Sequence, residues 1–258
     1  MANACQSQSM LSLLFLLICF LPTAISRAII QMPYEHRLHR RDEDLFCESW
    51  RLSVETNNVG YWTLVPSKCA SYVELYMNGD KYISDSVAVA LDSVAFAETI
   101  NVGSDGKDAW VFDIDETLLS NLPFYKIYGY GTEPTTDAAF NEWAELAAAP
   151  VLPASLKFYN DLKQLGFTII LLTGRTQNQT VATVKNLVIA GYSDWERLIL
   201  RGPDDNEPAI VFKSKKRAEL ESEGYRIRGS SGDQWSDLFG YAVAERSFKL
   251  PNPMYFVP

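Results

Sequence analysis

The sequence predicts an α/β fold in which a mainly parallel sheet is covered by helices on both faces. Short apolar runs have the length and composition of buried strands, at 109–114, 167–172, 197–200 and 225–228. Segments with helical spacing at 154–165, 177–190 and 214–223 separate these runs, and a glycine follows each helical segment. Strands that alternate with helices of this length form βαβ units, and sheets of such units are buried on both faces.

The remaining segments are less regular. Apolar residues at three- and four-residue spacing predict two helices over 67–99, interrupted at Gly79-Asp80, within an N-terminal helical extension over 45–104. Residues 118–153 are rich in aromatic side chains without a clear period, and we expect a small irregular insertion there. This insertion lies inside a main domain over 105–258, in which 239–243 is a candidate for one more strand.

Composition narrows the chemistry that this chain can perform. The 258 residues include 32 acidic and 23 basic side chains, and the formal net charge of −9 disfavours binding to nucleic acid. The only histidines, His36 and His39, lie in a basic N-terminal stretch. A Ser-His-Asp triad or a histidine zinc site would need one of them. If the chain is an enzyme, carboxylates perform its chemistry.

The N-terminus has the pattern of a signal peptide over 1–26. An apolar run at 10–21 is too short to span a bilayer and is followed by small residues. A buried N-terminal helix is the alternative. Residues 27–44 lack apolar periodicity and are interpreted as a mobile arm or pro-segment. No later run reaches eighteen apolar residues, so we expect no membrane partner. The predicted signal peptide indicates a secretory route to the cell exterior, the wall or the vacuole.

This route affects two cysteines and one asparagine. Secretion exposes the chain to an oxidising compartment, where Cys47 and Cys69, the cysteines outside the leader, are expected to form a disulfide. Two free buried thiols are the alternative. Asn178 begins the only N-x-S/T sequon and is a candidate for glycosylation, although an unmodified sequon is also compatible with the sequence.

Candidate functional residues follow the predicted strands, and parallel sheets bind ligands at this edge. Asp113 and Asp115 follow the first strand and point to the same side of an extended chain. Two adjacent carboxylates need a cation between them or a shared proton. The alternative is a helix N-cap. Asp233 and Asp237 follow the last strand, where their oxygens suit Mg²⁺, although an Asx turn at a helix start would look the same.

Two further candidates suit a phosphate group. Thr173 precedes a glycine at the end of the second strand, where a hydroxyl and backbone amides hold phosphate oxygens or simply form a turn. Lys213 precedes the charged helix and is placed to balance a phosphate or a carboxylate. Because Lys215, Lys216 and Arg217 follow it, a solvated basic cluster is the alternative.

Together these motifs resemble the haloacid dehalogenase-like (HAD) phosphatases over residues 109–240. The four motifs of that superfamily match 113–117, Thr173, Lys213 and 232–237. More narrowly, FDIDETLLSNLPFY at 112–125, SGDQWSDL at 231–238, VETNN at 54–58 and RSFKLPNPMY at 246–255 resemble plant class B acid phosphatases of the vegetative storage protein group. The resemblance implies a HAD-like sheet with a small cap.

The same resemblance implies a mechanism. Asp113 would be the nucleophile and Asp115 the general acid/base, with a modestly raised pKa. Thr173 and Lys213 would bind phosphoryl oxygens. The implied cofactor is Mg²⁺, held by Asp113, the Asp115 backbone carbonyl and Asp233, with Asp237 behind them.

The implied function is that of a secreted acid phosphatase acting on small phosphomonoesters, and a homodimer is a possible assembly. A short cap implies an open site that accepts many such esters. The alternative is a vegetative storage protein with weak or vestigial phosphatase activity.

Overall fold

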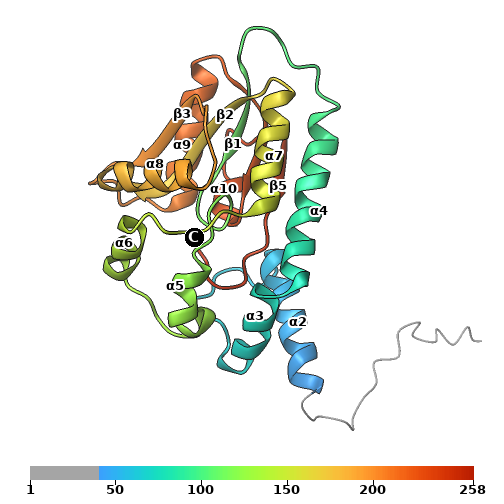
Figure 1. Cartoon of the computed structure of the whole chain (residues 1–258), viewed down its shortest axis with the longest axis vertical. Helices are drawn as coiled ribbons and strands as arrows, with labels where there is room; N and C mark the ends of the chain where they lie inside the picture. Colours follow the sequence, from blue (N-terminus) through green and yellow to red (C-terminus); the bar gives the residue numbers. More distant parts are fainter. Residues whose placement is uncertain (1–40) are drawn as a thin grey trace, which may run out of the picture. The chain divides into compact units, whose positions relative to one another are not determined.

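The computed structural model describes residues 41–258. At its centre lies a five-stranded parallel sheet (Figure 1). The predicted signal peptide and the segment 27–40 lie outside the described residues. The strands are β1 (Asp108–Phe112), β2 (Thr168–Thr176), β3 (Arg197–Arg201), β4 (Arg226–Gly232) and β5 (Arg246–Lys249). Their order in the sheet is β3-β2-β1-β4-β5, and all four pairings are parallel.

The strand order places a binding site beyond the central strand. From β1 the chain adds β2 and then β3 on one side, and β4 and β5 follow on the other side. A crevice therefore opens between the carboxyl ends of β1 and β4, where the direction of winding reverses. Every residue of β1 is buried, as expected for the centre of a parallel sheet.

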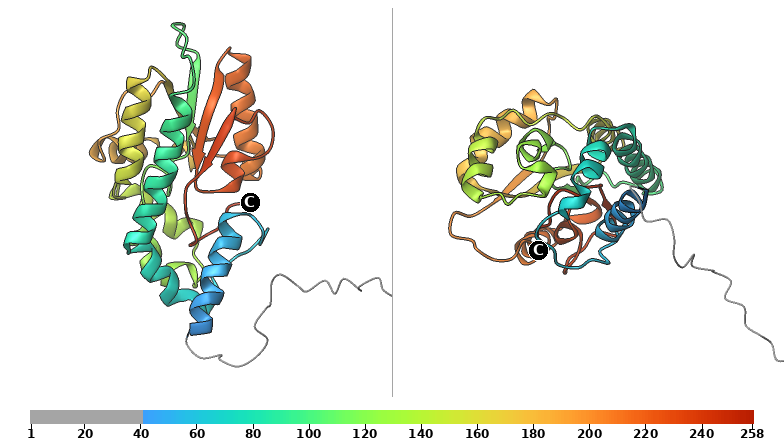
Figure 2. Two further views of the ribbon diagram at one scale, coloured as in Figure 1. Left: turned by 90° about the vertical axis from the view of Figure 1, so that its right-hand side faces the viewer. Right: turned by 90° about the horizontal axis from the view of Figure 1, so that it is seen from below.

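Helices cover both faces of this sheet, as predicted (Figure 2). On one face α4 (Asp80–Ala97), α7 (Pro153–Gln164) and α8 (Thr180–Ile189) pack around buried Trp110 and Phe112. The Trp110 ring lies 5.2 Å from Phe158 and 5.5 Å from Phe248 between centroids. On the other face α9 (Ala209–Ser222) places Phe212 against Val111 and its neighbours. The two faces bury separate hydrophobic clusters.

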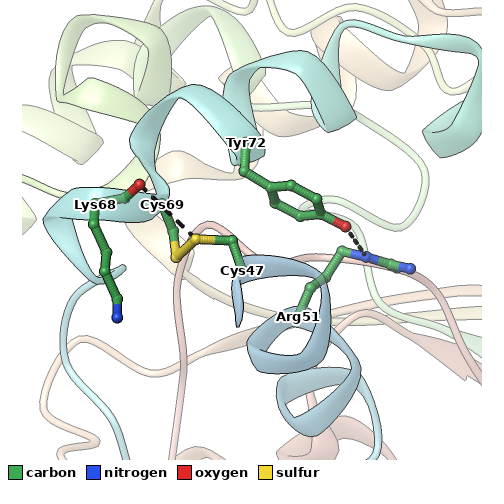
Figure 3. Close-up of a disulfide and its surroundings, with 5 residues drawn as sticks. All are labelled: Cys47, Arg51, Lys68, Cys69 and Tyr72. Atoms are coloured by element: carbon green, nitrogen blue, oxygen red, sulfur yellow. Dashed lines mark hydrogen bonds between the residues drawn. A yellow bond between two sulfur atoms is a disulfide. The ribbon is translucent and has the colours of Figure 1, made fainter. Parts of the chain in front are cut away.

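The N-terminal helices are joined by the predicted disulfide. They are α2 (Arg41–Glu55), the short 3₁₀ helix η1 (Ser67–Cys69) and α3 (Ala70–Met77). Cys47 of α2 is bonded to Cys69 across a Cα separation of 5.4 Å (Figure 3). Beside it, the Arg51 guanidinium donates a hydrogen bond to the Tyr72 hydroxyl. Because α2 begins at Arg41, the expectation of an arm that continues to residue 44 is wrong by about one helical turn.

The aromatic-rich insertion is more regular than predicted. It contains α5 (Leu122–Ile127), the 3₁₀ helix η2 (Gly129–Gly131) and α6 (Asp137–Glu145). These helices are too short for a period to be read, and their aromatic residues pack in several directions. Phe124, Tyr125 and Tyr130 share a buried cluster with the N-terminal helices and with Met254 near the C-terminus. The insertion is thus fixed to both ends of the described chain.

The candidate strand at 239–243 is wrong. That segment is a turn with exposed apolar side chains, since Phe239, Tyr241 and Val243 are each about half exposed. The fifth strand is β5, where only Phe248 is fully buried among charged and polar neighbours. Its mixed composition hid the strand from a search for apolar runs. No helix within residues 41–258 has the length and apolar character needed to cross a membrane.

Candidate active site

Three aspartates meet beyond the carboxyl ends of β1 and β4. Asp113 directly follows β1, Asp233 directly follows β4, and Asp237 lies in the short helix α10 (Trp235–Leu238). One carboxylate oxygen from each lies within 4.8 Å of those from the other two, and all three side chains are buried. The backbone N–H of Asp113 donates to Ser231 at 2.9 Å, which holds the two strand ends together. The structure therefore brings these predicted residues into one cluster.

Lys213 joins this cluster. Its Nζ lies 2.5 Å from Asp113 Oδ1 and also donates to Asp237 Oδ1. Burial acts to lower the pKa of Lys213, but the charges of Asp113 and Asp237 outweigh it and raise the pKa above its ordinary value. The ammonium ion is therefore retained. It is a buried ion-pair partner, and the alternative of a solvated basic cluster is wrong for this residue.

The position of Lys213 differs from the expectation. The sequence predicted a helix that starts after it, whereas α9 begins at Ala209 and places Lys213 in its second turn. Pro208 precedes the helix, and the apolar first turn, with buried Ala209 and Phe212, lacks the charges that marked the rest. Lys213 is therefore held by a regular helix packed on the sheet.

The aspartate cluster carries more negative than positive charge. Three carboxylates share the site with one ammonium, which contacts two of them, so ionised carboxylates would leave a surplus of two negative charges in a buried site. Burial and the neighbouring Asp237 raise the pKa of Asp233 to about 7. Burial also raises the pKa of Asp113 well above its ordinary value. Such shifts indicate that the carboxylates need compensation, and a divalent cation held by their oxygens would balance this charge.

Asp115 has a different environment. The Arg175 guanidinium donates to both of its oxygens, with Nη2 2.7 Å from Oδ1 and Nε 3.0 Å from Oδ2. Asn121 donates a further hydrogen bond at 2.9 Å. Burial acts to raise the pKa of Asp115, but the charge and hydrogen bonds of Arg175 lower it on balance. The pKa of this carboxylate is therefore lowered, and the expectation of a modestly raised pKa is wrong.

Arg175 and Asn121 were not among the site residues predicted from the sequence. Arg175 follows Thr173-Gly174, so its place at a strand end was available as a signal. Asn121 lies in the insertion, where nothing marks one asparagine as special. Its side-chain oxygen accepts from Trp143 Nε1 of α6 at 2.8 Å, so the insertion helps to orient Asp115.

Thr173 lies within β2. The strand continues to Thr176, beyond the end predicted at residue 172, with an irregularity in its pairing with β3. The Thr173 hydroxyl is buried and accepts a hydrogen bond from the backbone N–H of Arg175 at 3.2 Å. Its neighbour Gly174 is exposed, and Gly174 and Arg175 both line the cavity described below.

Glu116 is a buried acid that the sequence analysis missed. Its backbone has a positive φ of 53°, and its side chain is fully buried. The carboxylate accepts hydrogen bonds from the Asn121 backbone and the Ser120 hydroxyl. Burial and the charge of Asp233 raise the pKa of Glu116 to about 8. Glu116 thus closes the loop that follows β1 and holds the backbone of Asn121, whose side chain donates to Asp115.

A cavity of about 450 Å³ lies above the cluster. Asp113, Asp115, Lys213 and Asp233 form part of its lining. The insertion contributes Tyr125, Thr136, Phe140 and Asn141. Arg201 at the end of β3 and Asp205 after that strand also line the cavity. Asn178 is exposed in the 3₁₀ helix η3 (Gln177–Gln179), next to the cavity-lining Gln179. The cavity has room for a phosphate group and a small organic substituent.

The sheet order, with this acidic cluster at the switch point, defines a HAD-like fold. A solved structure supports the fold: the class C acid phosphatase from Bacillus anthracis aligns with a TM-score of 0.61 at 24% identity. The alignment covers 74% of this chain and 86% of that chain. The fold predicted from the sequence is thereby confirmed.

Residues 34–258 match the family "HAD superfamily, subfamily IIIB (Acid phosphatase)", and the chain belongs to that family. Acid phosphatase 1 of Solanum lycopersicum is 49% identical over 218 residues, which are 84% of this chain and 85% of that protein. The Stem 28 kDa glycoprotein of Glycine max is 43% identical over 84% of this chain and 86% of its own length. Vegetative storage protein 1 of Arabidopsis thaliana is 41% identical over 82% of this chain and 79% of its own length. The predicted family is confirmed.

Proposed function

We propose that this acid phosphatase hydrolyses phosphate monoesters by way of an aspartyl-phosphate, with Asp113 as the nucleophile. The observation that supports this role is the position of Asp113 at the end of the central strand, facing the cavity and paired with Lys213. An Asp113 oxygen attacks phosphorus while the bond from phosphorus to the leaving oxygen breaks. Water then hydrolyses the acyl phosphate and releases inorganic phosphate.

Asp115 is proposed as the general acid and base. It gives a proton to the leaving oxygen and later takes one from the attacking water. Its pairing with Arg175 keeps the carboxyl oriented and lowers its pKa, so a large protonated fraction requires acidic solution. A general acid with a lowered pKa is protonated mainly in acidic solution, which explains why a phosphatase with this ion pair would work at acidic pH.

The phosphoryl oxygens are proposed to bind at Lys213 and at the turn after β2. Lys213 supplies a buried positive charge, and the exposed Gly174 leaves its backbone accessible to a phosphate oxygen. The buried Thr173 hydroxyl shapes this turn through its bond to the Arg175 N–H. Because the hydroxyl accepts in that bond, its own hydrogen remains available for donation to a phosphate oxygen.

The carboxylates fit a divalent cation, and we propose Mg²⁺. Asp113 and Asp233 would hold it through carboxylate oxygens and Asp115 through its backbone carbonyl, with Asp237 adjacent. The ion would supply positive charge that offsets the repulsion between an anionic nucleophile and an anionic ester. Oxygen ligands alone, without thiol or imidazole, are the set that Mg²⁺ prefers.

Secretion, use of the Asn178 sequon and dimerisation remain part of this proposal. Storage is the second candidate function, favoured by the 41% identity to a vegetative storage protein. The test is hydrolysis of an aryl phosphate at mildly acidic pH, with Mg²⁺ or with a chelator. We expect turnover with Mg²⁺ and its loss with the chelator. Folded protein that shows no turnover with Mg²⁺ would leave storage as the better account.

A further inference from the structure

We infer that Glu55, the last residue of α2, is a positioning residue for the metal site, acting on Asp233 through Asn252 and Lys249. The inference rests on the proposed role of Asp233 as a metal ligand. Glu55 belongs to the N-terminal helices, outside the parallel sheet, and is 178 residues before Asp233 in the chain. It therefore makes the N-terminal helices part of the active site.

The contacts form a continuous path. Glu55 Oε1 accepts from the backbone N–H of Asn252 at 3.0 Å, and Glu55 Oε2 lies 2.8 Å from Lys249 Nζ. The Asn252 side chain then donates from Nδ2 to Asp233 Oδ2 at 2.6 Å. Asn252 and Asp233 are buried, and about 15% of the Glu55 side chain is exposed. The path is short and almost entirely shielded from water.

The local sequence makes the hydrogen bond between Glu55 and the Asn252 backbone important for the segment 251–253. Pro251 and Pro253 flank Asn252 and carry no N–H group, so Asn252 supplies the only backbone donor of this tripeptide. That donor bonds to Glu55. A hydrogen bond to a charged acceptor is roughly twice as strong as one to a neutral acceptor, so neutralising Glu55 would loosen the segment 251–253.

The orientation of the Asn252 amide is also fixed. Its Oδ1 accepts from the Met254 N–H at 2.9 Å, which directs Nδ2 toward Asp233. Asp233 Oδ2 additionally accepts from Gln234 Nε2 at 2.7 Å, so two amide donors occupy this oxygen. Among the described residues no group donates to Oδ1 of Asp233. The two amides therefore hold Asp233 by Oδ2 and leave Oδ1 available to a metal ion.

Glu55 also restrains a competing cation. Lys249 of β5 is paired in the sheet with Gly232, the residue before Asp233. Its ammonium group is held by Glu55 and by the Leu250 carbonyl, each at 2.8 Å. Without the Glu55 charge, Lys249 would be free to pair with Asp233 and to compete with a metal ion for it.

The test is Mg²⁺ binding to the full secreted chain, measured by titration calorimetry and by the shift of Tm on adding Mg²⁺, without substrate. We expect Glu55→Gln to raise the Kd for Mg²⁺ roughly 10- to 100-fold, the range seen when groups behind metal ligands are removed. The kcat at saturating Mg²⁺ should fall much less than the affinity. Glu48→Gln is the matched control, because Glu48 lies on the same helix in an exposed pair with Lys81.

A second variant separates positioning from a structural effect. Asn252→Ala should raise the Kd to a similar extent, and adding Glu55→Gln to it should raise the Kd by a smaller factor than in the wild-type background, because part of the Glu55 effect passes through Asn252. An unchanged Kd in Glu55→Gln, with a lower Tm both with and without Mg²⁺, would overturn the inference and leave Glu55 a structural residue. Wild-type protein that binds no Mg²⁺ would refute the proposed metal site and with it the inference.

Discussion

Arg175 and Asp115 form a buried ion pair, in which the guanidinium contacts both carboxylate oxygens at 2.7 to 3.2 Å. Only about 1% of the Arg175 side chain is exposed, against 17% for Asp115. The pair couples the proposed general acid to β2, whereas the proposed nucleophile is paired with α9 through Lys213. Asp113 and Asp115, which are separated by one residue in the sequence, therefore have pKa shifts in opposite directions.

Removing Arg175 should change the pH profile. Arg175 lowers the pKa of Asp115, so in Arg175→Gln that pKa rises and the carboxyl stays protonated to higher pH. We expect the alkaline limb of kcat for an alkyl phosphate to move to higher pH, while kcat at the optimum falls about 10- to 100-fold because orientation is lost. The control is Arg197→Gln, in an exposed pair with Glu223. An unmoved limb would contradict the role given to this pair.

Gly232, the last residue of β4, should not tolerate a side chain. A Cβ there would lie 2.5 Å from the Asp237 Cβ and would push α10 away from the cluster. We expect Gly232→Ala to weaken Mg²⁺ binding and to lower kcat/KM at least about tenfold, since misplaced groups are this costly in active sites. Gly202→Ala is the control, because the nearest atom to its Cβ is 3.9 Å away. If Gly232→Ala were as active as Gly202→Ala, α10 would have adapted to the added methyl group and the prediction would be wrong.

Asp108, at the start of β1, should support stability in a defined pH range. Hydrogen bonds from Arg226, then from Gly103 and Arg228, lower its pKa well below the ordinary value despite burial. A carboxylate with a depressed folded pKa stabilises the protein above its unfolded pKa of about 3.9, and that contribution is lost as pH falls toward the folded pKa. Its contribution is therefore fully present at mildly acidic pH.

The variant Asp108→Asn tests this expectation by urea unfolding at several pH values. Above about pH 5 it should cost about 2 to 4 kcal/mol, because it leaves buried hydrogen bonds to two arginines weakened. Below about pH 4 the difference from wild type should shrink, because the Asp108 carboxylate of the unfolded wild-type chain takes up a proton before that of the folded protein does. Glu223→Gln, at an exposed ion pair, should cost under about 1 kcal/mol at any pH. A difference for Asp108→Asn that grows in acid would contradict this account.

The disulfide should contribute to stability rather than to chemistry. Cys47 and Cys69 are 22 residues apart, and a crosslink over a loop of this length stabilises by about 3 kcal/mol on the loop-entropy account. We expect reductant to lower the Tm of wild type and to have no effect on the Cys47→Ser/Cys69→Ser variant, which should already unfold at the lower temperature. A Tm unchanged by complete reduction, confirmed by thiol titration, would contradict this prediction.

Much of the fold was predictable because apolar runs mark buried strands directly. Asp113 and Asp233 follow such runs, so their meeting at one edge of a parallel sheet could be inferred. Glu55 and Asn252 could not be paired in this way, since 197 residues separate them and neither has a periodic context. The start of α9 was missed because its first turn is apolar while the rest is charged. Sequence patterns reveal local structure, whereas the groups that orient the site come from distant segments.

The last prediction separates the two acids of the loop after β1. Asp113→Asn removes the attacking oxygen, so no phosphoryl-enzyme should form. Asp115→Asn leaves Asp113 and its Lys213 partner in place, and the proposed backbone contact to the metal is retained. This variant should still attack an aryl phosphate with a good leaving group, because such an ester needs little protonation. Its aspartyl-phosphate should then persist, because the base that activates water has been removed.

The measurement is phosphate retained on acid-quenched protein after mixing each variant with a labelled, activated aryl phosphate. We expect near-stoichiometric label on Asp115→Asn, with one burst of phenol, and none on Asp113→Asn. Asparagine at 115 still accepts from Arg175 through its amide oxygen, so the variant should fold, and its Tm checks this. Label on the Asp113 variant, or continued phenol release without label on a folded Asp115 variant, would reverse the two roles. Asp161→Asn, in an exposed pair with Lys157, should behave as wild type.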